Sequence, residues 1–371
     1  MLTIHLVAGA RPNFMKVAPL YFALERTNWC QPLIVHTGQH YDPNMSDSFF
    51  KDLGLPKPNF HLNIGSGTHA EQTAGILLAY EKILVSDPPD WVIVVGDVNS
   101  TLAATLTAKK LNFRVAHLEA GLRSKDRTMP EEINRIITDS ISDLLWTPSK
   151  DADKNLNKEG IPAAKISRVG NVMIDSFELL RKQIEKTLTY QEFGLTPKNF
   201  GVVTLHRPSN VDNKKVLAEI IKQLSIVAQT IPLVFALHPR TKLRLQKFGF
   251  FKDFATTKGI HLTTPMSYIK FMGLVRSSQF IVTDSGGIQE ETTYLGIPCL
   301  TLRDTTERPI TVEMGSNMLT KPSHISKLIQ KAISGNWKQG KCPPLWDGKT
   351  AERIVEDLFR RSDKPSNLVL E

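Results

Sequence analysis

The sequence predicts an α/β protein made of two Rossmann-like, doubly wound domains that face each other across a cleft. Short apolar runs alternate with helix-length segments along almost the whole chain. This alternation is typical of βαβ units and of parallel sheets with helices on both faces. A polar, lysine-bearing segment over 175–199 separates the two halves, and 371 residues are enough for two domains of ordinary size.

The expected strands share a short length and an apolar composition. They are residues 2–8, 33–36, 91–95, 114–117 and 144–147 in the first half, and 201–205, 233–237, 280–283 and 299–302 in the second. We expect one domain over 1–175, a second over 176–355 and a C-terminal tail over 356–371. Ligands of such sheets bind beyond the carboxyl ends of the strands, so those ends should carry the functional residues.

Composition excludes several classes of protein. With 41% hydrophobic and 22% charged residues, the chain resembles an ordinary globular protein. No apolar run approaches the roughly 18–20 residues that span a membrane, so we expect no membrane partner. The net charge of +9 is scattered and comes without a nucleic-acid-binding motif, which argues against a nucleic acid partner. Three widely spaced cysteines indicate a cytoplasmic protein.

The segment TDSGGIQEE (283–291) has the pattern of a phosphate-binding turn. It follows the apolar run 279–282 and leads into a helix over 288–295, which ends before a glycine. Glycines let a ligand approach the backbone, and the first N–H groups of a helix attract an anion. Ser285, Gly286 and Gly287 are therefore candidate phosphate ligands. The alternative is an ordinary glycine-rich turn.

Acidic residues follow the phosphate-binding turn and could contact the rest of a nucleotide. A carboxylate in the first turns of the helix, Glu290 or Glu291, can reach a ribose hydroxyl.

The loop after the first strand, GARPNFMK (9–16), lacks the second glycine of a nicotinamide-binding fingerprint. Arg11 occupies that position, where a guanidinium suits bidentate contact with a phosphate. Lys16 adds a second cation one helical turn later. Alternatively, Arg11 pairs with a surface acid and Lys16 is solvated. The failed fingerprint predicts that no redox cofactor is used.

Three acids lie just beyond strands or in the first turn of a helix. Asp97 in VGDVNST and Glu119 in HLEAGLRS follow adjacent apolar runs, and Glu131 lies in MPEEINR. Carboxylates gathered in one cleft raise each other's pKa and suit acid–base chemistry. Asp97 could instead cap a helix, and Glu131 could stabilise its own helix or pair with Arg135.

The second half places basic residues at strand ends. His206 in TLHRPSN and His238 in ALHPRTK are candidates for proton transfer or phosphate contact. In RDTTERP, either Arg303 or Arg308 could bind an anion. No set of histidines, cysteines and acids has the spacing of a zinc site, so we predict no metal.

Seven motifs in this order resemble the non-hydrolysing UDP-N-acetylglucosamine 2-epimerases. They are GARPNFMKVAPL, HTGQHYD, VGDVNST, HLEAGLRS, MPEEINR, DSGGIQEE and RDTTERP, and the match extends from residue 1 to about residue 320. The resemblance implies a GT-B architecture of two domains and inversion at C2 of the sugar to give UDP-N-acetylmannosamine. It also implies a homodimer and a role in making surface polysaccharide.

The resemblance also implies roles for individual residues. Asp97, Glu119, Glu131 and His206 match the catalytic positions of the family. The remaining matched positions would bind the substrate: Ser285, Gly286 and Gly287 the diphosphate, Glu291 the ribose, Phe271 the uracil, with Arg11, Lys16 and His238 nearby.

Some segments depart from the family pattern. GSGTH (65–69) replaces the arginine-containing stretch with which many bacterial members bind an activating second substrate molecule. Pro208-Ser209-Asn210 and Ile310 are further departures. The pattern also resembles relatives that act on UDP-2,3-diacetamido-glucuronate, which leaves the sugar open. The same nucleotide-binding features would also suit a GT-B glycosyltransferase, a hydrolysing epimerase or a silent nucleotide-sugar sensor.

Overall fold

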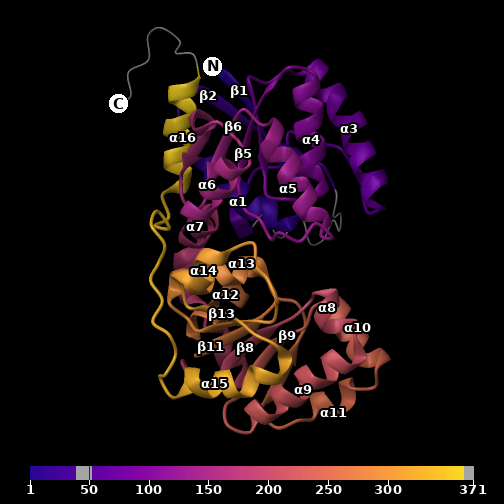
Figure 1. Ribbon diagram of the computed structural model, residues 1–371, viewed down its shortest axis with the longest axis vertical. Coiled ribbons are helices and arrows are strands. Elements are labelled where there is room, and N and C mark those ends of the chain that lie inside the picture. The colour runs from indigo at the N-terminus through magenta and orange to yellow at the C-terminus, as the bar shows by residue number, and fades with distance from the viewer. Residues whose placement is uncertain (39–49, 51, 363–371) are drawn as a thin grey trace. The chain divides into compact units, whose positions relative to one another are not determined.

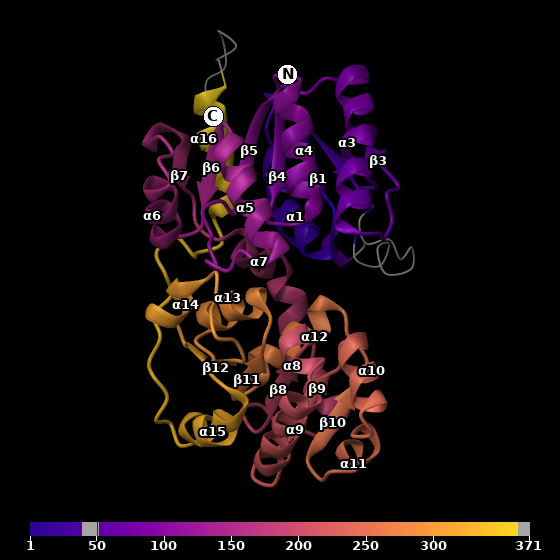
Figure 2. The same cartoon turned by 45° about the vertical axis from the view of Figure 1, so that its right-hand side comes forward.

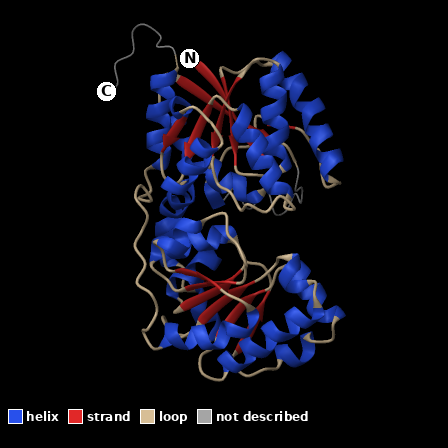
Figure 3. Ribbon diagram, viewed as in Figure 1, coloured by secondary structure: helices blue, strands red, loops and turns tan. Residues whose placement is uncertain are grey.

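The computed structural model describes residues 1–38, 50 and 52–362. The chain forms two compact units (Figure 1): unit 1 comprises residues 1–179 and 344–371, and unit 2 comprises residues 180–343. Helices lie to either side of the strands in each unit (Figure 3). Within the described residues, no helix is both long enough and apolar enough to cross a membrane.

Unit 1 is built on a parallel sheet of seven strands in the order β3-β2-β1-β4-β5-β6-β7. The strands are β1 (Leu2–Ala8), β2 (Cys30–His36), β3 (Phe60–His61), β4 (Trp91–Val95), β5 (Arg114–Leu118), β6 (Leu144–Thr147) and β7 (Ile166–Arg168). The helices are α1 (Arg11–Glu25), α3 (His69–Ser86), α4 (Asn99–Lys110), α5 (Pro130–Ile141), α6 (Lys150–Lys158), η1 (Ala163–Lys165), the start of α7 (Val172–Lys186), and α16 (Thr350–Arg361).

The order of these strands fixes where a ligand can bind in unit 1. Strand β1 pairs with β2 on one side and with β4 on the other, so the direction of winding reverses at β1. All five residues of β4 are buried, as expected for a strand covered by helices on both faces. The loops after β1, β4 and β5 therefore meet at one edge of the sheet, beside the topological switch point.

Unit 2 repeats the plan with six parallel strands in the order β10-β9-β8-β11-β12-β13. The strands are β8 (Gly201–Thr204), β9 (Leu233–Ala236), β10 (Ile260–Thr263), β11 (Phe280–Thr283), β12 (Cys299–Thr301) and β13 (Asn317–Leu319). Besides the end of α7, the helices are η2 (Thr189–Phe193), α8 (Pro208–Val211), α9 (Lys214–Ala228), α10 (Pro239–Lys247), α11 (Phe251–Ala255), α12 (Tyr268–Ser277), α13 (Gly286–Leu295), α14 (Pro309–Glu313), η3 (Pro322–His324) and α15 (Ile325–Ile333). Figure 2 shows the strands of this unit from a second direction.

The switch point of unit 2 lies between β8 and β11, which are paired in parallel. The loop after β11 is the predicted phosphate-binding turn, and α13 ends at Gly296 in the left-handed conformation, as expected. The prediction of two Rossmann-like parallel sheets is confirmed.

The C-terminal helix α16 belongs to unit 1. Trp146 donates its indole N–H to Asp357 at 2.8 Å, and Asp175 accepts the N–H of Ala351 at 2.7 Å. The N-cap residue of α16 makes no side-chain hydrogen bond to the start of its own helix. Asp175 of α7, which is distant in sequence, caps α16 instead. The sequence predicted domains over 1–175 and 176–355 and a tail over 356–371. In the structure, residues 344–361 instead group with unit 1.

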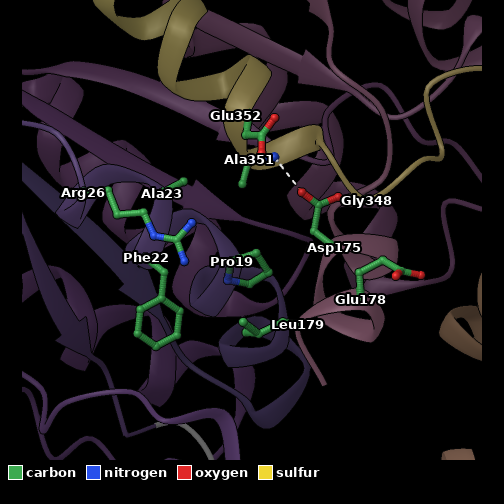
Figure 4. Close-up of a pocket in the computed structure, with 10 residues that line it drawn as sticks. All are labelled: Pro19, Phe22, Ala23, Arg26, Asp175, Glu178, Leu179, Gly348, Ala351 and Glu352. Carbon is green, nitrogen blue, oxygen red and sulfur yellow. Dashed lines mark hydrogen bonds between the residues drawn. The ribbon is translucent and has the colours of Figure 1, made fainter. Parts of the chain in front are cut away.

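A pocket of about 150 Å³ lies beside this cap in unit 1, between α1, α7 and α16 (Figure 4). Its charged lining residues include Arg26, Asp175, Glu178 and Glu352, while Pro19 and Phe22 contribute apolar surface. It contains none of the residues that the sequence predicts for the functional site.

Candidate functional site

The first turns of α1, which follows β1, bring a lysine into contact with a predicted catalytic acid. Asn13, in the first turn of α1, donates to the carbonyl oxygen of Val95 at 2.9 Å and so fastens this helix to the end of β4. Lys16 lies one turn further along and forms a buried ion pair with Glu119. Arg11 is the first residue of α1, but its side chain lies outside the described part of the structure.

A glycine after β4 makes room for this ion pair. Gly96 has a φ of +72°, and a Cβ there would lie 3.2 Å from both the Asn13 amide nitrogen and Lys16 Nζ, and 3.4 Å from Glu119 Oε2. Any side chain would therefore crowd the Lys16–Glu119 pair and would also favour a different backbone conformation. This arrangement explains why a glycine precedes Asp97.

Glu119 occupies a backbone conformation that few residues other than glycine adopt. Its φ is +74°, in the left-handed region, and its N–H donates to the carbonyl oxygen of Trp146 at 3.1 Å. Such a conformation costs about 1–3 kcal/mol and persists only where the surroundings enforce it. The backbone therefore turns the Glu119 side chain toward Lys16 at the carboxyl edge of the sheet.

Asp97 is held by a buried arginine of α5. Arg135 forms ion pairs with Asp97 and, at 2.6 Å, with Glu132. The N-cap residue of α4 is Val98, so Asp97 does not act as the helix cap that the sequence left open. Glu131 lies in the first turn of α5, four residues before Arg135. Asp97 and Glu119 are thus each paired with a cation at neighbouring strand ends.

In unit 2, Asp284 fixes His206 at the carboxyl ends of β8 and β11. The Asp284 carboxylate accepts the N–H of His206 at 3.0 Å and of Arg207 at 2.9 Å, and lies 2.9 Å from His206 Nδ1. Asn210 donates to it as well. Burial raises the pKa of Asp284, but these donors outweigh burial, and the pKa lies below its ordinary value.

His238 lies next to His206. Their ring centroids are 5.5 Å apart, and His238 is the N-cap residue of α10, where its Nδ1 accepts the N–H of Arg240 at 3.2 Å. The structure therefore brings these two predicted histidines together.

The predicted phosphate turn opens α13 with Ser285 as the N-cap residue, and the Ser285 side chain makes no cap hydrogen bond. The first N–H groups of an α-helix have no partner within the helix and attract anions. At Gly286, a Cβ would lie 2.6 Å from Arg308 Nη1 and 2.9 Å from Glu307 Oε1. Glycine therefore lets the guanidinium of Arg308 approach the start of α13.

Two acids hold that guanidinium in place. Arg308 lies 2.9 Å from Glu290 and 2.6 Å from Glu307, and all three residues are buried. Arg303 also pairs with Glu307 at 2.6 Å. Of the two arginines that the sequence left open, Arg308 is the one beside the glycine-rich turn.

Glu291 has a different environment from Glu290. Tyr268 of α12 donates its hydroxyl to Glu291 at 2.6 Å. Burial raises the pKa of Glu291 to about 8, so its carboxyl group is protonated at neutral pH. Phe271 is a half-buried residue on the same helix as Tyr268, one turn further along.

Sequence reasoning missed Asp284, Tyr268 and the contact of Arg135 with Asp97. Asp284 lies between β11 and Ser285 in the motif TDSGGIQEE. Its position at a strand end could have identified it as a functional residue. Arg135 was considered only as a partner of Glu131. Nothing in the sequence connects Tyr268 with Glu291. Among the described residues, no group of three or more histidines, cysteines or acids is arranged to hold a metal ion.

Comparisons with known proteins agree with these features. A family model described as UDP-N-acetylglucosamine 2-epimerase matches residues 22–358. The UDP-N-acetylglucosamine 2-epimerase of Methanocaldococcus jannaschii is 44% identical over 368 residues, which are 96% of this chain and 98% of that protein. The UDP-2,3-diacetamido-2,3-dideoxy-D-glucuronate 2-epimerase of Pseudomonas aeruginosa is 40% identical over 95% of this chain and 98% of its own length.

A solved structure extends the similarity to three dimensions. The crystal structure of Methanocaldococcus jannaschii UDP-GlcNAc 2-epimerase in complex with UDP-GlcNAc and UDP aligns with a TM-score of 0.87 and 43% identity, and the alignment covers 96% of this chain and 99% of that one. The resemblance that the seven motifs carried is thus confirmed over nearly the whole length. The chain belongs to the UDP-N-acetylglucosamine 2-epimerase family.

Proposed function

We propose that the protein inverts C2 of UDP-N-acetylglucosamine to give UDP-N-acetylmannosamine without net hydrolysis. One structural observation supports this proposal in addition to the family membership. Asp97 and Glu119 follow adjacent strands, and each is paired with a cation of a neighbouring helix. Two carboxylates held in defined positions are what proton removal and proton return at one carbon require.

The reaction must avoid direct deprotonation, because no carbonyl group acidifies the C2–H bond of the pyranose. We propose that the C1–O bond to UDP breaks as a base removes the C2 proton, in an anti elimination that gives 2-acetamidoglucal and UDP. A proton then returns to the opposite face of C2, and the diphosphate oxygen adds back to C1. Atoms and electrons balance without a redox step.

Asp97, Glu119 and Glu131 of unit 1 are the candidates for this proton transfer, and His206 of unit 2 is the fourth. Lys16 contacts Glu119 and Arg135 contacts Asp97, so both acids are held at the carboxyl edge of the sheet. We propose that one acid removes the C2 proton and that another returns a proton to the opposite face.

Unit 2 supplies the proposed site for UDP. The start of α13 with Ser285, Gly286 and Gly287 would hold the diphosphate, and Arg308, held against Gly286, would stabilise the charge that develops as UDP leaves. The protonated Glu291 can donate a hydrogen bond to a ribose hydroxyl, and Phe271 can contact the uracil. Arg11, Lys16 and His238 complete the proposed set of substrate-binding residues.

A second candidate substrate is UDP-2,3-diacetamido-glucuronate, because a relative with that activity in its name is 40% identical. The same elimination applies to it, and the two substrates differ at C3 and C6. The test is to incubate the purified protein with each sugar nucleotide separately and to identify the products by NMR. We expect the manno epimer of UDP-N-acetylglucosamine to form and reach equilibrium with its precursor.

Other products would contradict the proposal. Turnover of the diacetamido-uronate but not of UDP-N-acetylglucosamine would favour the second candidate. Free N-acetylmannosamine with UDP would indicate a hydrolysing enzyme, and an unchanged C2 configuration that needs an acceptor sugar would indicate a glycosyltransferase. Binding of either nucleotide without turnover would indicate a sensor.

Three further proposals concern the setting of the enzyme. We propose that it acts in the cytoplasm, that it is a homodimer, and that its product serves surface polysaccharide synthesis. Sedimentation of the purified chain tests the second of these directly, with a monomer as the contradicting result.

A further inference from the structure

A buried histidine lies beneath the two loops that carry the proposed catalytic acids. His117 is the fourth residue of β5 and is fully buried, with 0% of its surface exposed. Its neighbours across the sheet, Val94 in β4 and Leu145 in β6, are apolar. A polar ring in such surroundings must find hydrogen-bond partners, because a buried polar group without one costs free energy.

Both ring nitrogens of His117 face hydrogen-bond acceptors. Nδ1 lies 2.6 Å from Asp139 Oδ1, and Nε2 lies 2.8 Å from the carbonyl oxygen of Gly96. A carbonyl oxygen can only accept, so Nε2 must carry a proton. Asp139 Oδ2 accepts from Arg123 at 2.7 Å and from the N–H of Gly121 at 3.0 Å, which is the pattern of an ionised carboxylate. Nδ1 must then carry a proton too.

Charge balance agrees with this assignment. Arg123 pairs with Asp139 and also with Glu159, to which it donates two hydrogen bonds of 2.8 and 2.6 Å. With His117 as an imidazolium, two cations and two carboxylates neutralise each other. With a neutral His117, one negative charge would remain uncompensated, at a cost in a site where Asp139 is fully buried.

His117 and Asp139 contact the two loops that carry the proposed catalytic acids. Gly96, whose carbonyl oxygen His117 binds, immediately precedes Asp97. Gly121, whose N–H Asp139 binds, lies two residues after Glu119. The loop between Glu119 and Arg123 is also fastened to α6, because Asn155 donates to the carbonyl oxygen of Gly121 at 2.9 Å.

We propose that His117 is a positioning residue, an imidazolium that holds Gly96 directly and, through Asp139, the loop of Glu119. This role rests on the proposed function, since it concerns the placement of Asp97 and Glu119. His117 does not touch the reacting atoms in this scheme. It fixes the separation of two acids whose geometry the reaction requires.

Another buried histidine of the same sheet provides a matched control. His5 in β1 is also 0% exposed, and its Nδ1 lies 3.1 Å from the hydroxyl of Tyr80. Burial lowers the pKa of His5 to about 4, so this ring is neutral at neutral pH. His5 contacts neither acid-bearing loop in the described structure, and it belongs to no proposed site.

The first test uses ¹⁵N NMR of the histidine side chains in the full-length protein. We expect His117 to show two protonated ring nitrogens from pH 6 to pH 8, and His5 to show a neutral ring in the same spectra. Asp139→Asn removes the counter-charge and should convert His117 to the neutral pattern. A neutral His117 in the unsubstituted protein overturns the proposal, and this result does not depend on catalytic activity.

The second test measures catalysis. In His117→Gln, both N–H donors are on one nitrogen, so the side chain can reach either Asp139 or the Gly96 carbonyl oxygen but not both. The loop that loses its contact should shift slightly, and we expect kcat to fall about 10²-fold, as for a small misplacement of a reacting group. KM should stay close to its original value. His5→Gln should lower thermal stability and leave kcat unchanged. An unchanged kcat in His117→Gln, or an equal loss in His5→Gln, contradicts the positioning role.

The two tests separate the two proposals. If the unsubstituted protein lacks epimerase activity on either sugar, the proposed function fails while the NMR test of the imidazolium still stands. If His117→Gln does not fold, Asp139→Asn repeats the kinetic measurement with a side chain of the same shape. Retention of full kcat by Asp139→Asn with a neutral His117 then overturns the positioning role.

Discussion

The two units use carboxylates in different ways. In unit 1, Glu119 and Asp97 each contact a cation, Lys16 or Arg135, at the carboxyl edge of the sheet. In unit 2, Glu291 contacts the phenol of Tyr268, and its pKa rises to about 8 because it is buried. Unit 1 thus pairs its acids with cations, whereas unit 2 keeps one acid protonated, which suits hydrogen bonding to a neutral hydroxyl.

Three other buried acids of unit 2 hold neighbouring groups in place. Asp284 positions His206, and Glu290 and Glu307 position Arg308. We therefore expect substitutions of Asp97 and Glu119 to act mainly on kcat, and substitutions at the start of α13 to act mainly on nucleotide affinity. Four predictions test this division.

The largest expected effect comes from the acids of unit 1. Glu119→Gln and Asp97→Asn should each lower kcat by about 10²–10⁴-fold, because each removes a group proposed for proton transfer. Isothermal titration with UDP should give an affinity close to that of the unsubstituted protein. Normal turnover by either variant would show that its acid has no catalytic role.

Removing the cation instead of the acid should destabilise the fold. Lys16→Met leaves Glu119 as a buried charge without its lysine, and loss of one partner of a buried pair costs about 3–5 kcal/mol of unfolding free energy. The double variant Lys16→Met/Glu119→Gln is the control and should recover much of that loss. Calorimetric unfolding measures both, and equal losses in the single and double variants would contradict the coupling.

A smaller effect is expected at the phosphate turn of unit 2. In Gly286→Ala, the new Cβ would lie 2.6 Å from Arg308 Nη1, so the guanidinium or the turn must shift. We propose that this shift weakens the contact of Arg308 with the diphosphate by about 1–3 kcal/mol, which is roughly a 5- to 150-fold loss of UDP affinity. Titration with UDP checks this. A variant that binds UDP normally but loses kcat would reverse the assignment of the two units.

The last prediction concerns the pH dependence that Glu291 gives to stability. Its pKa is about 8 in the folded protein, above the ordinary value of 4.5, so the folded state binds a proton more tightly than the unfolded state. Its contribution to stability is therefore present below about pH 4.5 and is lost as the pH rises to about 8, at up to about 1.4 kcal/mol per pH unit. Glu291→Gln should remove this slope from calorimetric unfolding between pH 5.5 and 8. An identical slope in both proteins would contradict the raised pKa.

Sequence patterns predicted the elements that local rules control. The strand and helix around Ser285, including the end of α13 at Gly296, follow from apolar runs and glycine placement. Contacts between distant segments were not predictable in this way. Lys16 meets Glu119 because β1, β4 and β5 are neighbours in the sheet, and this order is not visible in a single sequence.

The same limit explains the residues that were missed. The approach of Tyr268 to Glu291 depends on how α12 packs against α13, and the contact of Arg135 with Asp97 depends on where α5 lies. The position of Asp97 and Glu119 at neighbouring strand ends, in contrast, was predictable, because any doubly wound sheet brings the loops after such strands together.

The proposed reaction requires that bonds at C1 and C2 break and form again. The most direct measurement is NMR of UDP-N-acetylglucosamine incubated with the protein in heavy water. We expect one solvent deuterium to enter C2 of UDP-N-acetylmannosamine during turnover, with UDP retained in the product at equilibrium. Epimerisation without deuterium at C2 would contradict the elimination.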